Sequence, residues 1–399
     1  MEIINMIPVC NPAVGNDFID REKEISLILS TLEKDSVLLI APRRFGKTSI
    51  MRKLEKELLD ADEICVFLEV EDVNSPHRFI SEIVMALIEN EKIEQRTKLI
   101  PAFKNGFQWF KDNIEEIGIS VFKAKLRTNI KNDLKENWID KSAQIFDVIN
   151  EADSKICFIV DEFPIAIEKI EQKYTENFLH WFRKIRQVSP NLRFIVGGSV
   201  SMDRVVRNVG GVSVINDFKR IRIDGFQKQI ALDLIEKVFQ EEGWTYVPSY
   251  GEKILGCIGE AYIPYFIAIM LSAIKEEYIL RDGEINDELI EKTYNFRILG
   301  NEGKYYFEHY SQRLRIFYGD MEEKAAIAIL KNVCNVDCYP VDMAFGIFKQ
   351  ETAIDDYEQF MDLIADLSND FYLEHDPENG LKFYSKMLQD WWRIYHGDV

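Results

Sequence analysis

The chain has 399 residues, 47% of them hydrophobic, and a formal net charge of -19 at pH 7. This length and composition predict two or three packed domains and exclude a disordered chain. The acidic balance also opposes binding to the phosphate backbone of nucleic acids, unless one face of the protein is locally basic.

The first half of the chain alternates between two kinds of segment. Short continuous apolar runs, typical of strands buried on both faces of a parallel sheet, occur at residues 37–40, 64–68, 156–160 and 194–196. Segments with a helical period separate them, at residues 47–59, 79–88, 143–149 and 178–188. The alternation predicts an α/β domain with a doubly wound parallel sheet. A helix is also expected at residues 21–32, with Asp20 as its N-cap.

The pattern changes after residue 225. A fifth strand is predicted at 220–223, where Arg and Ile alternate, and residues 226–300 then read as a helical lid. Residues 301–399 are helical until two short apolar runs, at 371–373 and 381–384, flank the turn-rich segment 376–380 and predict a β-hairpin. We therefore predict an α/β core at 1–225, a lid at 226–300 and a winged-helix-like domain at 301–399. Residues 90–140 read as an insertion in the core, with a candidate strand at 119–126.

Targeting and cysteine patterns favour a soluble protein of the cytoplasm. The N-terminus has no basic region followed by a long apolar stretch, and no apolar run reaches 18 residues. Six scattered cysteines fit a reducing compartment. Cys334 and Cys338 form a C-x3-C pair without a second Cys or His pair nearby, so we interpret them as structural rather than as zinc ligands.

A phosphate-binding loop follows the first predicted strand. The pattern G-x4-G-K-[ST] binds ATP because backbone N–H groups at a helix N-terminus wrap the phosphates, a lysine reaches the β and γ oxygens, and a hydroxyl ligates Mg²⁺. Ala41 stands where the first glycine is usual, which adds a methyl group at the strand end. The predicted nucleotide-binding residues are Pro42, Arg43, Arg44, Phe45, Gly46, Lys47, Thr48 and Ser49.

Roles within this loop differ. Lys47 is the predicted catalytic cation and Thr48 a predicted Mg²⁺ ligand. For Arg43 and Arg44 three alternatives stay open: contact with phosphate, pairing with acids on the lid, and exposure to solvent.

A second pattern ends the strand at 156–160 with two adjacent carboxylates, Asp161 and Glu162. Asp161 is predicted to hold Mg²⁺ through water, and Glu162 to orient and deprotonate the attacking water. Taken alone, the pair fits an acidic turn after a core strand. Beside the phosphate-binding loop, the metal and catalytic roles are favoured.

Two further candidates depend on the arrangement of the strands. One predicted strand, at 37–40, precedes the phosphate-binding loop, and another, at 156–160, ends at the two carboxylates. If the strand at 194–196 lies between these two strands, Ser199 comes near the γ-phosphate as a polar catalytic sensor. The alternative is that Ser199 lies in a plain turn after its strand. Arg204 or Arg207 on the next helix is a candidate arginine finger for a neighbouring subunit, although surface arginines are commoner.

These motifs resemble the archaeal-type ATPase family, a branch of the STAND NTPases related to AAA+ and origin-recognition ATPases within the ASCE class of P-loop proteins. The resemblance rests on Phe18-Ile-Asp20-Arg21-Glu22, the loop at 41–49, Ile159 to Phe163, Gly197-Gly198-Ser199 and Pro264-Tyr265. It implies a P-loop core with a helical lid and a winged-helix-like C-terminal domain. It also implies adenine contacts by Phe18, Arg21 and Pro264. Asp20, Ala41 and the spacing before Pro264 depart from the family pattern.

The function that this resemblance implies is a slowly hydrolysing ATPase that acts as a switch through a protein partner or self-association, with ATP and Mg²⁺ as cofactors and no membrane partner. One alternative is a DNA-binding winged-helix regulator, but residues 351–380 contain ten Asp or Glu and no Lys or Arg. Another is a scaffold that holds nucleotide without turnover. Lys123, Lys125, Arg127 and Lys131 are a candidate contact surface, or a solvated face.

Overall fold

The computed structural model describes residues 18–41, 44–90, 133–151, 155–198, 202–209, 212–281 and 284–397. The chain divides into two compact units. The sheet unit comprises Arg21–Ala41 and Lys47–Ile223. The helical unit comprises Met1–Asp20, Asp224–Val399 and the short loop segment Pro42–Gly46. The phosphate-binding loop therefore belongs to both units, because its first half lies in one and its second half in the other.

The sheet unit is built on a five-stranded parallel sheet in the order β2-β3-β4-β1-β5. The strands are β1 (Val37–Ile40), β2 (Ile64–Glu69), β3 (Ile156–Asp161), β4 (Leu192–Gly198) and β5 (Lys219–Arg222). All six residues of β3 are buried, as expected for a strand covered on both faces. The five predicted strands are present, within two residues of their expected bounds at each end.

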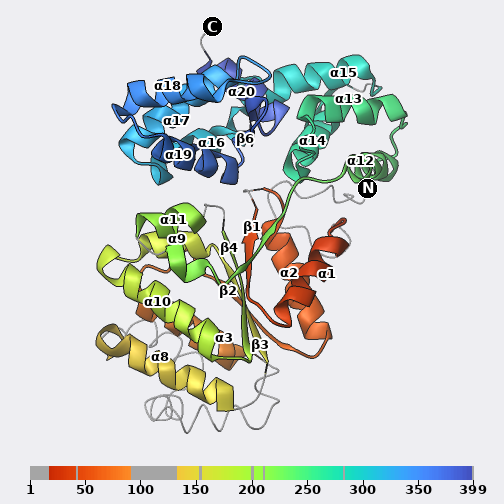
Figure 1. Cartoon of the computed structure of the whole chain (residues 1–399). Helices are drawn as coiled ribbons and strands as arrows, with labels where there is room; N and C mark the ends of the chain where they lie inside the picture. Colours follow the sequence, from red (N-terminus) through yellow and green to blue (C-terminus); the bar gives the residue numbers. More distant parts are fainter. Residues whose placement is uncertain are drawn as a thin grey trace. The chain divides into compact units, whose positions relative to one another are not determined.

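Helices cover both faces of this sheet, as Figure 1 shows. One face carries α1 (Glu22–Leu32) and α2 (Lys47–Asp60). The other carries α3 (Pro76–Glu89), α8 (Asp133–Glu151), α9 (Phe163–Lys169), α10 (Gln172–Val188) and α11 (Met202–Asn208). A short 3-10 turn, η2 (Val212–Ile215), precedes β5. The doubly wound α/β prediction is confirmed.

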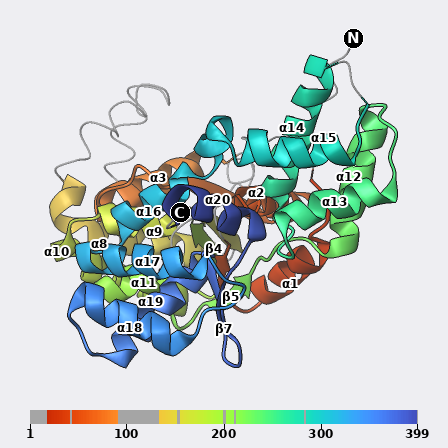
Figure 2. The same ribbon diagram turned by 90° about the horizontal axis from the view of Figure 1, so that it is seen from above.

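The helical unit contains two groups of helices, which Figure 2 separates. The first group comprises α12 (Lys228–Glu241), α13 (Pro248–Ile258), α14 (Pro264–Arg281), α15 (Asp287–Lys292), the π-helix η3 (Thr293–Ile298) and the 3-10 helix η4 (Asn301–Tyr306). The second comprises α16 (Glu308–Phe317), α17 (Asp320–Val333), α18 (Val341–Thr352), α19 (Tyr357–Asn369), the antiparallel hairpin β6 (Leu373–Asp376) with β7 (Gly380–Phe383), and α20 (Lys386–His396). Helices followed by a hairpin thus occur where the sequence predicts them.

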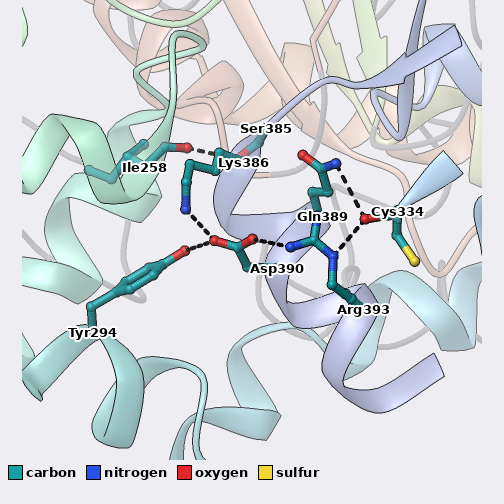
Figure 3. Close-up of polar contacts among 8 residues, drawn as sticks. All are labelled: Ile258, Tyr294, Cys334, Ser385, Lys386, Gln389, Asp390 and Arg393. Carbon is teal, nitrogen blue, oxygen red and sulfur yellow. Dashed lines mark hydrogen bonds and ion pairs between the residues drawn. The ribbon is translucent and has the colours of Figure 1, made fainter. Parts of the chain in front are cut away.

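Helix α20 ties the two groups together through side-chain hydrogen bonds (Figure 3). The Ser385 hydroxyl donates to the carbonyl oxygen of Ile258 at the end of α13. Further along, Arg393 donates to the carbonyl oxygen of Cys334, which caps α17. Between them, the Asp390 carboxylate accepts from the Tyr294 hydroxyl at 2.8 Å and pairs with Lys386 and Arg393. The helical unit is therefore cross-linked by polar contacts as well as by its apolar core.

The Tyr294→Phe variant is expected to lower the free energy of unfolding by about 1–2 kcal/mol, because a buried hydroxyl loses its bond to a carboxylate. Burial and Asp390 together raise the pKa of this phenol, so it donates throughout the accessible pH range. Denaturant unfolding measures the change. Tyr357→Phe, on a half-exposed ring, serves as the control and should stay within about 0.5 kcal/mol. Equal effects of the two variants would contradict this account of Asp390.

Two local predictions are wrong. The N-cap of α1 is Arg21 rather than Asp20, and no side chain caps this helix. Both residues have positive φ, 60° for Asp20 and 83° for Arg21. The chain therefore enters the helix through a left-handed turn, and the Asp20 side chain does not cap the first turn of the helix. Phe371, expected in the first strand of the hairpin, also has positive φ, 61°, and β6 begins two residues later.

Some predictions fall outside the described residues, namely the candidate strand at 119–126 and the basic cluster from Lys123 to Lys131. None of the helices in the described ranges combines the length and apolar character that a membrane-spanning helix needs.

Candidate phosphate-binding and catalytic site

The topology of the sheet brings the predicted site residues of the sheet unit to one edge. Strand β1 leads into the phosphate-binding loop and α2, β3 ends at Asp161, and β4 lies between these two strands. In parallel sheets the carboxyl ends of neighbouring strands form the edge at which ligands bind. The condition for Ser199 to lie near this edge is thus met by the strand order, while Ser199 itself is outside the described residues.

The first turn of α2 and the end of β3 meet through charged and polar side chains. The Thr48 hydroxyl donates to Asp161 Oδ2 at 2.7 Å. The Lys47 ammonium lies 3.2 Å from Asp161 Oδ1 and 3.3 Å from Glu162 Oε1. Lys47 and Asp161 are buried, and Glu162 keeps 24% of its side chain exposed. Four residues from two distant parts of the sequence therefore form one connected group.

Glu162 reaches Lys47 because the backbone turns sharply after β3. Its φ of 58° and ψ of 31° are left-handed, a conformation that costs a non-glycine residue about 1–3 kcal/mol. In a continuing strand, successive side chains point to opposite faces, which would separate Asp161 from Glu162. The turn instead lets both carboxylates approach the same ammonium group. Strain of this kind at a carboxylate is typical of functional sites.

Two glycines at the end of β4 make room for this group. A Cβ atom on Gly197 would lie 2.7 Å from Met51 Cε and 3.1 Å from Lys47 Cδ. A Cβ atom on Gly198 would lie 2.4 Å from Pro164 Cδ and 3.4 Å from Glu162 Oε2. From the sequence these glycines are expected only as part of the motif Gly197-Gly198-Ser199, and their role as spacers for Lys47 and Glu162 was not predicted. No local signal predicts it, because it depends on packing between distant strands and helices.

The Gly198→Ala variant is expected to push Pro164 and Glu162 apart from β4, at a cost in stability of about 1–3 kcal/mol. ATP hydrolysis should fall about tenfold, since catalysis is sensitive to small displacements of the base. Gly256→Ala is the matched control, because no atom beyond the adjoining residues of its own helix lies within 4 Å of the new methyl group. It should hydrolyse ATP at the wild-type rate. A Gly198→Ala enzyme with an unchanged rate would contradict the spacer role.

The donor set of this group suits Mg²⁺. A hydroxyl and a carboxylate lie in contact, and hard oxygen ligands of this kind, completed by substrate phosphates and water, are what Mg²⁺ prefers. Among the described residues, no group of three or more His, Cys, Asp or Glu side chains is placed to hold a metal ion alone. The contact between Thr48 and Asp161 is the part of this group that fits Mg²⁺.

The rest of the phosphate-binding loop is described in part. Gly46 has φ of 82°, which its lack of a Cβ atom permits. Ala41 is buried and has negative φ, so the missing first glycine leaves the backbone unstrained there. Ser49 is buried in α2. Pro42 and Arg43 lie outside the described residues.

The arginines and the predicted adenine contacts are distributed as follows. The Arg44 guanidinium lies 4.6 Å from the centre of the Tyr265 ring, within the helical unit. Arg21 is buried and pairs with Glu24 at 2.9 Å in the sheet unit, while Phe18 and Pro264 belong to the helical unit. The adenine contact among them stays a prediction. Arg204 is 1% exposed, which leaves the half-buried Arg207 as the better candidate for an arginine finger.

The sequence of residues 18–255 matches a family described as an ATPase domain that occurs predominantly in Archaea. The matched segment covers more than half of the chain, and it contains the loop, both carboxylates and the glycine pair. The chain belongs to this archaeal ATPase family. Among curated proteins, none has a sequence that matches it.

Solved structures share the fold of this chain. A Walker-type ATPase of Pyrococcus abyssi superposes with a TM-score of 0.63 at 14% identity, over 96% of this chain and 99% of the other. The Aeropyrum pernix ORC2 protein, solved as ADPNP–ADP complexes, superposes with a TM-score of 0.52 at 10% identity, over 93% and 92%. At these identities the likeness shows the fold, a P-loop core followed by a helical C-terminal region.

Proposed function

We propose that this archaeal-type ATPase is a Mg²⁺-dependent molecular switch of the STAND or AAA-like kind that binds ATP and hydrolyses it slowly. The observation that carries the proposal is the connected group of Lys47, Thr48, Asp161 and Glu162 at the carboxyl edge of the sheet. It supplies a cation for the phosphates, hydroxyl and carboxylate oxygens for the ion, and a partly exposed carboxylate for the water.

Each side chain has a distinct proposed role. Lys47 binds the β and γ oxygens, and Thr48 with Asp161 holds the Mg²⁺ that neutralises phosphate charge. Glu162 orients the attacking water and accepts its proton. Because Lys47 also lies against both carboxylates, a bound phosphate competes with Asp161 and Glu162 for the same ammonium group. Nucleotide thus alters the contacts at the end of β3, which is the differential interaction that a switch requires.

The proposed organisation has a core at 1–225, a lid at 226–300 and a winged-helix-like domain at 301–399. A protein partner or a second copy of the chain would bind one nucleotide state in preference to the other. A DNA partner is disfavoured by charge. Helix α19 carries Glu358, Asp362 and Asp366 and no Lys or Arg. At the hairpin turn, hydrogen bonds from Asn379 and the backbone lower the pKa of Asp376, which keeps the turn anionic. Phosphate groups would be repelled by both elements.

Hydrogen exchange of the full chain with ADP and with a slowly hydrolysed ATP analogue tests the switch, with light scattering to record the mass in each state. The proposal predicts exchange differences between the two nucleotides beyond the loop itself, or a change of mass. Identical exchange and mass with both nucleotides would leave a nucleotide-holding scaffold. Salt-dependent binding to duplex DNA near physiological ionic strength would instead revive the DNA-binding alternative.

A further inference from the structure

Phe45, two residues before Lys47, is 1% exposed although phosphate-binding loops lie at the protein surface. Its ring centre lies 5.3 Å from that of Phe371 and 6.0 Å from that of Tyr384. Phe371 and Tyr384 themselves form an edge-on pair at 4.8 Å. All three residues belong to the helical unit, which includes Pro42–Gly46. Three rings in mutual contact at these distances form a specific aromatic cluster.

The partners of Phe45 are held at the open end of the β6–β7 hairpin. Phe371 precedes β6 with a left-handed φ of 61°, and Tyr384 follows β7. The backbone N–H of Tyr384 donates to the carbonyl oxygen of Tyr372 at 3.0 Å, which closes the hairpin beside the two rings. The Tyr384 hydroxyl donates to Asp224 at 3.4 Å. The ring pair is thus fixed by backbone contacts that do not involve the loop.

The residue before Phe45 has a second anchor in the same unit. The Arg44 guanidinium lies over the ring of Tyr265, the second residue of α14. Tyr265 is 7% exposed, so this ring is itself held in the core of the first helix group. Two consecutive residues of the loop therefore contact the hairpin and α14, immediately before the glycine that leads into Lys47.

We propose that Phe45 is a positioning residue, which seats the phosphate-binding loop on the Phe371–Tyr384 pair and so fixes Gly46 and Lys47 in their phosphate-binding arrangement. The inference rests on the proposed ATP site and adds the coupling between that site and the hairpin. A loop that pivots at Gly46 must be held from its N-terminal side to present its N–H groups to phosphate. By thermodynamic linkage, phosphate bound to the loop in turn stabilises the contact of the Phe45 ring with the Phe371–Tyr384 pair.

ATP affinity of the full chain, measured for Phe45→Leu, Phe371→Leu and the double variant, tests this inference. Each single variant should weaken Mg-ATP binding about tenfold, the value of one lost aromatic pair. The double variant should bind no more weakly than either single one, because both changes break the same contact. Phe360→Leu, a fully buried phenylalanine elsewhere in the helical unit, is the control and should keep the affinity within about twofold.

Hydrogen exchange gives a second readout that general loosening would not produce. Mg-ATP should slow exchange at the β6 and β7 amides in the wild type and leave them unaffected in Phe45→Leu. Unchanged affinity in both single variants, additive losses in the double variant, or equal ATP protection of the hairpin in Phe45→Leu would overturn the inference. Phe371→Leu leaves the loop sequence intact, so it decides the outcome if Phe45→Leu does not fold. A wild-type chain that binds no ATP would instead contradict the proposed function.

Discussion

The Glu162→Gln variant is expected to bind ATP at least as tightly as the wild type and to hydrolyse it about 10²–10⁴-fold more slowly. An amide cannot accept the proton of the attacking water, whereas its size and hydrogen bonding preserve the turn after β3. Binding is retained because Lys47 loses a competitor for its ammonium group, which lies 3.3 Å from Glu162 Oε1. The substitution should leave the left-handed backbone at this position unaltered, because Gln has the same Cβ branching as Glu.

Steady-state phosphate release and nucleotide affinity, measured on the same preparation, separate the two effects. Glu176→Gln, on an exposed glutamate of α10 in the same unit, controls for the loss of one negative charge and should match the wild type. Hydrolysis at the wild-type rate by Glu162→Gln would remove Glu162 from its role as base. Loss of binding instead would mean that the carboxylate shapes the site rather than acting on water.

Lys47→Ala is expected to weaken ATP binding about 30-fold or more, because the loss of a buried charge partner costs about 2–5 kcal/mol and each 1.4 kcal/mol is a factor of ten. The Lys47 side chain is 6% exposed and lies against two carboxylates. Without it, Asp161 and Glu162 also repel the phosphates that the lysine would have attracted.

Lys53→Ala is the matched control for this change. Lys53 lies on the same helix, is 36% exposed and pairs with Glu57 at 2.6 Å. Exposed pairs of this kind contribute about 0–1 kcal/mol, so ATP affinity should be unaltered. Titration calorimetry measures both variants. Equal affinity of Lys47→Ala and the wild type would show that the loop does not bind phosphate through its lysine.

The sequence predicts those parts of the site that depend on local pattern. The strand, the loop and the helix start at Lys47 are contiguous, and so are β3 and its two carboxylates. The loop and the two carboxylates come together because the carboxyl ends of parallel strands lie at the same edge of the sheet. That inference needed the position of β4 between β1 and β3, which the sequence could state only as a condition.

Features that depend on distant packing could not be predicted. The spacer role of Gly198 arises because Pro164 approaches it from another segment, and the burial of Phe45 arises from residues more than 300 positions away. Asp20 was expected as a helix cap by residue type, but the backbone enters α1 with two consecutive positive φ angles. Residue preference is a weak guide where tertiary contacts set the backbone.

Binding of ATP by the wild-type full chain, with Mg²⁺ and with EDTA, tests the central claim most directly. Calorimetric titration should give one ATP per chain, with an affinity that falls at least about tenfold when Mg²⁺ is removed, because Thr48 and Asp161 would hold this ion and the ion would offset the phosphate charge. Absence of binding at millimolar ATP with Mg²⁺ would contradict the account, because the connected group at the end of β3 would then be a structural cluster.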